Sequence, residues 1–378
     1  MKLKIALLGS TGSIGRQVVN CVNRYPERFE IISLAACSNA ALLSEQIKTL
    51  HPKIAALADE RYAKDVVVES GTKFYSGRSA TLEAVTEEAD LVFVAIMGFA
   101  GLESVIKAIN LKKNVALANK ETLVAGGEIV TALAKEKGVE LIPVDSEHSA
   151  IWQSMYLDKK TPFKRLLITA SGGAFRDVPL EELGNMKARD ALKHPNWVMG
   201  KKITIDCATM VNKGLEVIEA KWLFDCPYDK IGVLYHPESI VHSLVEYPDG
   251  ALIAQLGYPS MELPISLALS YPERLEGAPT LDLVGKTLHF DQVSLKRYPC
   301  FKVILEGAKA GGNIPCALSA ANEEIVKLYL NDEITFSEIY DYLAYVLDKT
   351  PKRRVDYEEL VRTDGEARKL VLDRFPRR

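Results

Sequence analysis

Short apolar runs alternate with helix-like stretches through residues 1–145, and this alternation constrains the fold more than any other feature. Each run is continuously apolar, as expected for parallel strands that are covered on both faces. The six runs lie at 4–9, 30–37, 53–58, 90–96, 114–119 and 140–144. Helical periodicity lies between them, most clearly at 14–24, 101–110 and 126–137. Such repeated units predict an α/β fold that begins with a Rossmann-like, doubly wound parallel sheet.

A different organisation is predicted after residue 145. We expect a strand at 164–171, a helix at 209–224 and a hairpin around the Pro-Asp-Gly turn within 240–258. Residues 172–200 are rich in Gly, Pro, His and Trp and show little periodicity, which is typical of a lid or binding loop. The rest of the chain predicts an α+β catalytic domain at 146–275 with this flexible lid loop, a linker at 276–300 and a C-terminal helical bundle at 301–378.

The charge balance excludes one class of function, and the apolar pattern excludes another. The chain has 378 residues, with 47 Lys and Arg against 50 Asp and Glu, a formal net charge of -3. A general nucleic-acid binder would carry a basic excess. No window approaches the roughly 18 apolar residues of a membrane helix, so we expect a soluble, cytoplasmic protein that binds neither nucleic acid nor membrane. Its six cysteines form no C-x-x-C pair, and we expect reduced thiols.

A glycine triplet follows the first predicted strand. Gly9, Gly12 and Gly15 stand between that strand and the next helix, where glycines permit a tight turn and the close approach of a pyrophosphate. This context favours a dinucleotide site over a plain turn. After the second strand, where NAD-selective sites keep an acidic residue, the sequence is AACSN. Ser38 and Asn39 can donate to a 2′-phosphate, so the segment favours NADPH, although no arginine is near them in the sequence.

Asp145 and Glu147 follow the last predicted strand of the sheet, in the stretch LIPVDSEHSAIWQ. Two carboxylates at this spacing repel each other unless a positive group lies against both. One interpretation is that Asp145 and Ser146 cap a helix at 148–155, since Asp and Ser are favoured N-caps. The other is a divalent ion such as Mg²⁺ or Mn²⁺, which prefers oxygen ligands. Doubly wound sheets bind ligands at the carboxyl ends of their strands, and this favours the second interpretation.

A third carboxylate and a lysine come from the predicted helix at 209–224. Asn212 and Glu216 are four residues apart and Lys213 and Glu216 three, so all three lie on one side of the helix. A surface ion pair between Lys213 and Glu216 explains them at least as well as a metal site does, and spacing alone leaves both interpretations open. Gly214 is costly inside a helix, which indicates that close approach to the backbone matters there.

Further polar residues follow predicted strands or lie in the predicted lid. The turn at residues 171–173, Ser-Gly-Gly, can present a hydroxyl and bare backbone amides to an anion. Residues 119–121, Asn-Lys-Glu, follow another strand end and so point to the same crevice. His194 and Trp197 flank a proline in the lid; a lone histidine is more often a surface residue, whereas an exposed tryptophan needs something to pack on. We interpret His236, in YHPES, as structural.

Several of these segments, in the same order, resemble the 1-deoxy-D-xylulose 5-phosphate reductoisomerase family of the non-mevalonate isoprenoid pathway. They are GSTGSIG, LANKETLV, VDSEHSAIWQ, TASGGAFRD, KHPNWVMGKKITIDCATMVNKGLEVIEAKWLF and HPESIVHSLVEYPDG. The C-terminal helices match by architecture more than by motif. The resemblance implies an enzyme that rearranges a small sugar phosphate, 1-deoxy-D-xylulose 5-phosphate, and reduces it with NADPH to 2-C-methyl-D-erythritol 4-phosphate. It also implies a divalent metal (Mg²⁺, Mn²⁺ or Co²⁺), an NADPH-binding domain at 1–145 and a homodimer.

The resemblance also assigns roles to residues of this sequence. The implied metal ligands are Asp145, Glu147 and Glu216, and the implied catalytic residues are Lys120, Glu147, His194 and Trp197. Substrate contacts are implied for Lys120, Ser146, Glu147, Ser171, His194, Cys207, Asn212, Lys213 and Glu216. Cofactor contacts are implied for Gly9, Thr11, Gly12, Ser13, Ile14, Cys37, Ser38, Asn39, Asn119, Glu121 and Gly200.

Two segments depart from the family pattern. Cys207 stands in IDCATM where the family usually has a serine in the phosphate pocket, and a thiol is a weaker hydrogen-bond donor than a hydroxyl. We therefore expect Cys207→Ser to lower the KM for substrate. AACSN lacks the basic residue that some relatives place near the 2′-phosphate, so we expect a less sharp preference for NADPH over NADH.

Two other functions are consistent with a glycine motif alone. One is a metal-independent NADP dehydrogenase that acts on another small carbonyl compound, whose activity EDTA would not affect. The other is a non-catalytic dinucleotide sensor, which would bind the cofactor without turnover and would leave the three carboxylates unexplained.

Overall fold

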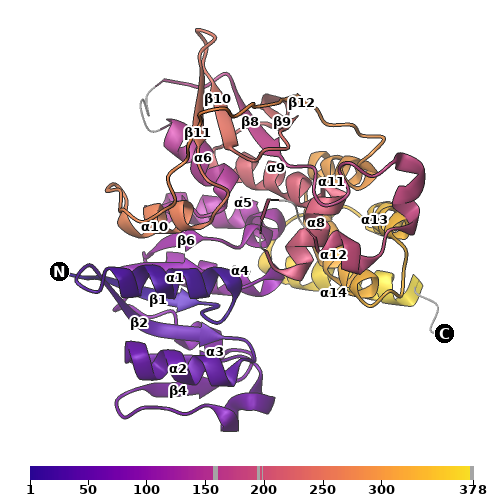
Figure 1. Ribbon diagram of the computed structural model, residues 1–378. Helices are drawn as coiled ribbons and strands as arrows, with labels where there is room; N and C mark the ends of the chain where they lie inside the picture. The colour runs from indigo at the N-terminus through magenta and orange to yellow at the C-terminus, as the bar shows by residue number, and fades with distance from the viewer. Residues whose placement is uncertain (156–160, 194–195, 198, 375–378) are drawn as a thin grey trace. The chain divides into compact units, whose positions relative to one another are not determined.

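The computed structural model describes residues 1–155, 161–193, 196–197 and 199–374, and the chain forms two compact units (Figure 1). The first unit comprises Met1–Thr122, Val130–Asp145 and Met261–Ala278. The second comprises Leu123–Ile129, Ser146–Ser260 and Pro279–Arg378. The expected boundary after residue 145 is therefore one of several points at which the chain passes between units, and neither unit is continuous in the sequence.

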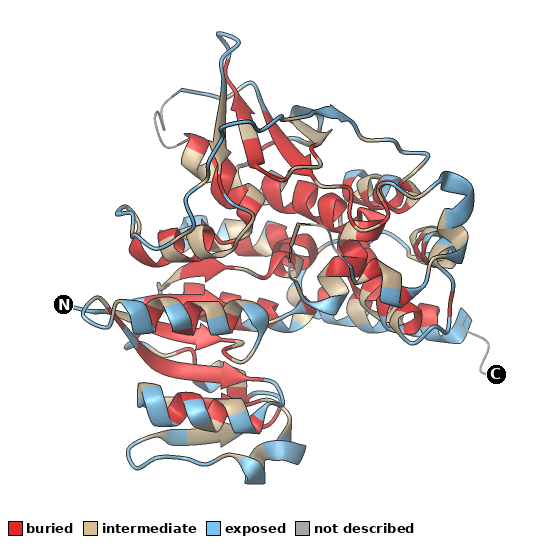
Figure 2. Ribbon diagram, viewed as in Figure 1, coloured by how far each residue is buried: buried red, intermediate tan, exposed pale blue. Residues whose placement is uncertain are grey.

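A parallel sheet forms the centre of the first unit. Its strands follow the order β4-β3-β2-β1-β5-β6-β7, with the bounds β1 Leu3–Leu8, β2 Phe29–Ala36, β3 Ile54–Leu57, β4 Lys73–Ser76, β5 Leu91–Val94, β6 Asn114–Leu117 and β7 Leu141–Pro143. Figure 2 shows the central strands as buried. The six predicted strands are confirmed. β4 was not predicted, because this edge strand exposes Lys73 and Ser76 and has no continuous apolar run.

Helices and 3₁₀ turns connect these strands. They are α1 Ser13–Arg24, α2 Ala40–Leu50, η1 Glu60–Asp65, α3 Ala80–Glu83, η2 Gly98–Ala100, α4 Gly101–Asn110 and α5 Lys120–Lys137, while α10 Glu262–Ser270 belongs to the same unit but connects none of these strands. α5 begins six residues before the predicted 126–137 because the Asn119 side chain caps it, accepting from Thr122 N at 2.7 Å. Gly126 has non-helical angles, φ -122° and ψ 20°, and this break explains why the periodicity is visible only beyond it.

α10 was not predicted, and it belongs to the first unit although it follows residue 260. It packs on α1, where Arg24 and Glu262 form an ion pair at 3.3 Å. Just beyond α10, Arg28 pairs with Glu273 at 2.5 Å. Part of the segment expected to lie in the catalytic domain therefore completes the N-terminal sheet unit.

The second unit contains a mixed sheet in the order β11-β10-β8-β9-β12. Its strands are β8 Arg165–Ala170, β9 Ile231–Tyr235, β10 Val241–Glu246, β11 Leu252–Leu256 and β12 Asp291–Gln292. β8 and β9 are parallel, whereas β10 pairs antiparallel with both β8 and β11, which confirms the predicted hairpin. β12 lies in the predicted linker and pairs antiparallel with β9, so part of that linker belongs to the sheet.

The helices of the second unit pack in two hydrophobic clusters, one of which also contains buried side chains of the mixed sheet. These helices are α6 Ser146–Met155, η4 Leu180–Asn185, α7 Ala188–Ala191, α8 Lys201–Thr209, α9 Val211–Leu223, η5 Tyr228–Lys230, α11 Pro299–Ala310, α12 Ile314–Leu330, α13 Phe336–Lys349 and α14 Tyr357–Arg374. Buried side chains of α8 and α9, such as Ile205 and Leu215, pack in one cluster with Ile304, Leu318 and Leu343. The four C-terminal helices are present as predicted, but they share their core with α8 and α9.

Residues 172–193, the first part of the predicted lid, contain regular structure. η4 and α7 lie within this segment, and Phe175, Ala188 and Ala191 are buried in the helical core. Arg297 Nη2 donates to the backbone oxygens of Phe175 and Val178, the latter at 2.6 Å. The first part of the segment is therefore fixed to the unit. Short turns rather than one long helix bury these side chains, which is why the sequence shows no periodicity.

Gly214 allows two helices of the second unit to approach closely. A Cβ at this position would lie 2.6 Å from Cγ2 of Ile304, so α9 and α11 could not pack as they do with any larger residue. The predicted close approach is thus present, and its partner is an apolar side chain. All six cysteines are free, as expected. Within the described residues, no helix combines the length and the apolar character needed to cross a membrane.

Candidate active site

Lys120 and Asp145 form a buried ion pair at the edge of the first sheet. Lys120 begins α5, after β6, and Asp145 follows β7; because these neighbouring strands are parallel, their carboxyl ends meet at the same edge. Lys120 Nζ lies 2.5 Å from Asp145 Oδ2, and the two side chains are 7% and 12% exposed. Asp145 directly precedes α6, which agrees with the helix-cap interpretation, but its carboxylate also carries this ion pair.

Lys213 joins two carboxylates that come from different helices. Glu147 lies in the first turn of α6 and Glu216 in α9. Lys213 Nζ lies 2.7 Å from Glu147 Oε1 and 2.5 Å from Glu216 Oε2. Asn212 Nδ2 donates to the other oxygen of Glu216 at 2.5 Å, and Ser146 Oγ donates to Glu147 Oε2 at 2.6 Å. Lys213 and Glu216 are 6% and 1% exposed, so this is a buried network and not a surface ion pair.

The carboxylate cluster has the donor set of a divalent metal site. One oxygen from each of Asp145, Glu147 and Glu216 lies within 4.8 Å of the others. Three carboxylates and no sulfur suit a hard ion such as Mg²⁺ or Mn²⁺. Burial lowers the pKa of Lys213, but Glu147 and Glu216 outweigh burial and raise that pKa above its ordinary value. The ammonium of Lys213 therefore stays charged, and its positive charge balances the carboxylates of Glu147 and Glu216.

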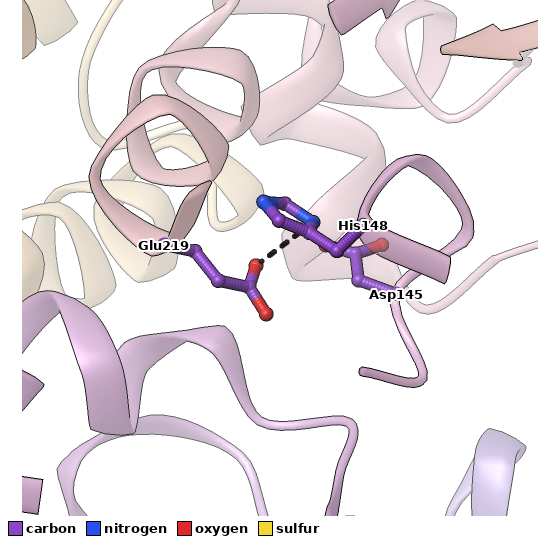
Figure 3. A group of neighbouring side chains, drawn as sticks. All are labelled: Asp145, His148 and Glu219. Carbon is purple, nitrogen blue, oxygen red and sulfur yellow. Dashed lines mark ion pairs between the residues drawn. The ribbon is translucent and has the colours of Figure 1, made fainter. Parts of the chain in front are cut away.

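His148 of α6 pairs with Glu219 of α9 (Figure 3), and these are the helices that carry Glu147 and Glu216. His148 Nε2 lies 2.9 Å from the backbone oxygen of Glu216, and its Nδ1 lies 3.3 Å from Glu219 Oε2, with both side chains fully buried. A carbonyl oxygen only accepts, so Nε2 carries a proton. A second proton must lie between Nδ1 and Glu219, because two lone pairs would repel each other there. The buried His148–Glu219 pair thus holds α6 against α9.

The turn between β1 and α1 is closely packed against its neighbours at two glycines. Gly9 has φ +89°, and a Cβ there would lie 2.4 Å from Ala95 O. A Cβ at Gly15 would lie 2.2 Å from Gly9 O. Gly12 precedes α1 without a side-chain cap, and the first turn of α1 contains no acidic residue. The helix dipole favours an anion at such an N-terminus. Thr11 lies in the same turn, and Ser13 and Ile14 are the first two residues of α1.

The other predicted cofactor residues follow strands of the first unit, with one exception. Residues 37–39 follow β2, and Asn39 caps α2 by accepting from Leu42 N at 3.1 Å. Asn119 Nδ2 donates to the backbone oxygens of Ile96 and Gly98, the latter at 2.9 Å, so it ties the loop after β5 to the start of α5. Glu121 lies in the first turn of α5. Gly200, at the N-cap of α8, belongs to the second unit.

The turn that begins with Ser171 packs on the backbone of Cys207 within the second unit. Residues 171–173 follow β8, and Gly173 N donates to Ser171 Oγ at 3.4 Å. Gly172 and Gly173 both have positive φ, +82° and +71°. A Cβ on Gly173 would lie 2.5 Å from Cys207 O, so the turn packs directly on α8. His194 lies outside the described residues.

His242 in β10 is a residue of this region that sequence reasoning missed. Its ring lies 5.9 Å from the ring of Trp197, and its side chain is buried. Burial lowers the pKa of His242, while the carboxylate of Glu147 acts in the opposite direction. The ring is therefore within electrostatic reach of the carboxylate cluster. The available signal was a histidine in the largely apolar run IVHSLV. His236 is structural, as predicted, because its Nε2 accepts from two backbone N–H groups at 3.1 Å.

Three protein-family models match the chain. The model described as 1-deoxy-D-xylulose 5-phosphate reductoisomerase matches residues 5–127. The model of the 1-deoxy-D-xylulose 5-phosphate reductoisomerase C-terminal domain matches 141–224. A DXP reductoisomerase C-terminal domain model matches 256–370. Together the three matches extend from β1 to α14.

Similarity to known proteins extends along the whole chain. The 1-deoxy-D-xylulose 5-phosphate reductoisomerase of Caldanaerobacter subterraneus subsp. tengcongensis is 44% identical over 380 residues, which cover 99% of this chain and 100% of that protein. Reductoisomerase 1 of Bacillus thuringiensis subsp. konkukian is 48% identical over 340 residues, 89% of this chain and 88% of that protein.

Solved structures agree with the sequence comparison. The reductoisomerase from Zymomonas mobilis in complex with NADPH has a TM-score of 0.92 at 37% identity and covers 100% of both chains. A DOX-P reductoisomerase in complex with NADPH, fosmidomycin and magnesium has a TM-score of 0.92 at 36% identity, with 98% of both chains covered. Since fold and sequence match over 88% or more of the length of each of these relatives, the chain belongs to the 1-deoxy-D-xylulose 5-phosphate reductoisomerase family.

Proposed function

We propose that the chain converts 1-deoxy-D-xylulose 5-phosphate to 2-C-methyl-D-erythritol 4-phosphate, by an intramolecular rearrangement followed by reduction with NADPH. The observation that carries this proposal is the cluster of Asp145, Glu147 and Glu216. A metal-independent dehydrogenase or a cofactor sensor has no use for three carboxylates held this close. A solved relative with both NADPH and magnesium supports the same conclusion.

Asp145, Glu147 and Glu216 would hold the divalent ion. When bound, such an ion acts as a Lewis acid on the oxygens of a ketose. Lys213 would change partners at the same time, because the oxygens it now contacts would be occupied by a second cation. Its ammonium would then be available to an anion, which we propose is the substrate phosphate. Asn212, one residue earlier on α9, would donate its amide to the same group.

The remaining assignments follow the family resemblance. Lys120 is proposed to lie beside the reacting carbons, where its charge, now paired with Asp145, would stabilise a developing oxyanion. Trp197 is proposed to cover the substrate from the predicted lid segment. Substrate hydrogen bonds are proposed for Ser146, Ser171, His194 and Cys207. Domain roles are proposed accordingly, with cofactor binding in the first unit and substrate binding in the second.

The first unit would bind the cofactor. The β1–α1 turn would hold the pyrophosphate of NADPH on the N-terminus of α1, and residues 37–39 would lie at the adenosine ribose. Asn119, Glu121 and Gly200 are proposed as further contacts. NADPH supplies the hydride that reduces the rearranged aldehyde.

A single assay tests cofactor, substrate and metal together. NADPH absorbance is followed with 1-deoxy-D-xylulose 5-phosphate and Mn²⁺, and EDTA is then added. Loss of absorbance that stops on chelation is the expected result. Oxidation that continues after chelation would contradict the metal role of the carboxylates and favour the metal-independent dehydrogenase. Bound NADPH without oxidation would favour the sensor.

Two further parts of the proposal rest on the resemblance alone, namely a homodimer and a cytoplasmic location. Size-exclusion chromatography with light scattering should give twice the chain mass of 41.8 kDa. A mass equal to one chain would contradict the dimer. Fractionation of the source cells should recover the protein with the cytoplasmic fraction.

A further inference from the structure

The segment after β2 carries no cation for the 2′-phosphate that distinguishes NADPH from NADH. Residues 31–47 contain neither arginine nor lysine. The strand order, however, puts the end of β3 beside the end of β2. Their pairing continues past both strands, because Asp59 N donates to Cys37 O at 2.9 Å. The start of η1 therefore lies next to the proposed ribose-binding residues.

Arg61, in η1, provides a guanidinium at this place. Its Nε lies 2.9 Å from Asp59 Oδ1 and its Nη2 lies 2.6 Å from Asp59 Oδ2, a two-bond contact that holds the group in one orientation. This contact uses only some of the five N–H donors of an arginine, and the side chain is 81% exposed. The charge of Asp59, which would otherwise repel a phosphate, is compensated by the same contact.

The position of Arg61 agrees with the direction in which a dinucleotide would lie. The ends of β1, β2 and β3 follow one another along the edge of the sheet. The end of β1 carries the glycine turn, and the end of β2 carries Ser38 and Asn39. A cofactor whose pyrophosphate lies on the glycine turn therefore places its adenosine ribose towards β2 and β3. We infer that Arg61 binds the 2′-phosphate and sets the preference for NADPH over NADH, an inference that rests on the proposed use of NADPH.

The test compares the Kd for NADPH and for NADH, each measured by cofactor fluorescence, in the full-length chain and in Arg61→Ala. Charge-assisted hydrogen bonds to a phosphate predict a roughly tenfold or larger rise in the Kd for NADPH, with the Kd for NADH changed by less than about twofold. Lys53→Ala is the matched control. Lys53 precedes β3 at its other end and forms an exposed ion pair with Glu88, so this variant removes the same charge away from the proposed site.

The outcomes separate a cofactor contact from a plain surface ion pair. Equal changes for both cofactors, or no change for either, would overturn the inference, since an exposed ion pair with Asp59 contributes little and does not discriminate. Arg61→Lys keeps the positive charge but lacks the planar guanidinium that can donate two hydrogen bonds to one phosphate. Its Kd for NADPH should lie between those of the unmodified protein and Arg61→Ala. Failure of the proposed function would give a different result, because the unmodified protein would then bind neither NADPH nor NADH. That result would overturn the inference about Arg61 as well.

Discussion

Replacing Glu216 with glutamine removes one carboxylate of the cluster and keeps the side-chain volume. Glu216 is 1% exposed, and its two oxygens accept from Asn212 and Lys213, each at 2.5 Å. A glutamine offers one oxygen and one amino group, so either Asn212 or Lys213 would then face a donor. Leaving one buried donor without an acceptor costs about 1–3 kcal/mol of unfolding free energy. The variant should therefore fold, with reduced stability.

The larger effect is expected on metal binding. Two unit charges about 4 Å apart interact by about 4 kcal/mol at an effective dielectric constant of about 20. The loss of one negative charge beside a divalent ion should thus weaken metal binding by about 10³-fold or more. Turnover should fall by a similar factor at a fixed, subsaturating Mn²⁺ concentration. The Kd for NADPH should stay within about twofold, because the glycine turn belongs to the other unit.

The assay measures NADPH oxidation across a Mn²⁺ titration, and cofactor fluorescence gives the Kd for NADPH. Glu246→Gln is the matched control, since Glu246 is also a buried glutamate of the second unit and pairs with Lys164 at 2.7 Å. The control should keep its dependence on Mn²⁺. Unchanged Mn²⁺ dependence in Glu216→Gln, or an equal loss of NADPH binding, would mean that Glu216 is structural and that the reasoning is wrong.

Three further predictions concern packing, positioning and pH. Gly214→Ala places a methyl group against α11 and should lower the free energy of unfolding by about 1–3 kcal/mol. Gly365→Ala, in α14 with nothing within 4 Å of the new methyl, should instead raise it by up to about 1 kcal/mol. Urea unfolding compares the two, and effects of equal sign would contradict the packing argument. Glu219→Met removes the acceptor of a buried imidazole N–H and should cost about 1–3 kcal/mol and weaken Mn²⁺ binding by roughly 10–100-fold. Glu219→Gln keeps an oxygen as acceptor, so it should lose less unfolding free energy and less Mn²⁺ affinity than Glu219→Met. Equal losses in the two variants would argue against the positioning role of Glu219. Burial raises the pKa of Glu324, but Lys327 and Arg368 outweigh it and lower that pKa below 4.5. Its contribution to stability is therefore present above the unfolded-state value and is lost as the pH falls through the lower folded-state value. Acidification to about pH 4 should lower the free energy of unfolding of the unmodified protein more than that of the Arg368→Met variant. Equal decreases in the two proteins would contradict this prediction.

Local patterns account for the parts of the site that sequence reasoning predicted. Asp145 and Glu147 are two residues apart at a strand end, and helical spacing brings Lys213 to the side of Glu216. A continuous apolar run marks each interior strand, and glycines mark the turn after β1. In each case the signal lies within about one turn of a helix or one strand, so no knowledge of the tertiary structure is needed.

Long-range pairing accounts for most of what was missed. Spacing could not show whether the contact between Lys213 and Glu216 is buried, because the second carboxylate of Lys213 comes from another helix. Arg61 lies in η1, which follows β3, and only the strand order reveals that the end of β3 lies next to the proposed ribose-binding residues after β2. β4 lacks an apolar run because it is an edge strand. The buried turns within residues 172–193 are too short to produce a period.

The discontinuity of the two units has a consequence for synthesis on the ribosome. Domains generally fold in order as the chain emerges, with the N-terminal one first. Here the first unit still lacks α10 when residue 145 has emerged, and α10 is translated only after residues 146–260 of the second unit. The contact of Tyr25 with Glu276 O at 2.5 Å forms later still. The face of α1 that contacts α10 therefore stays uncovered until α10 has been translated. We expect both units to complete their folding only near the end of translation.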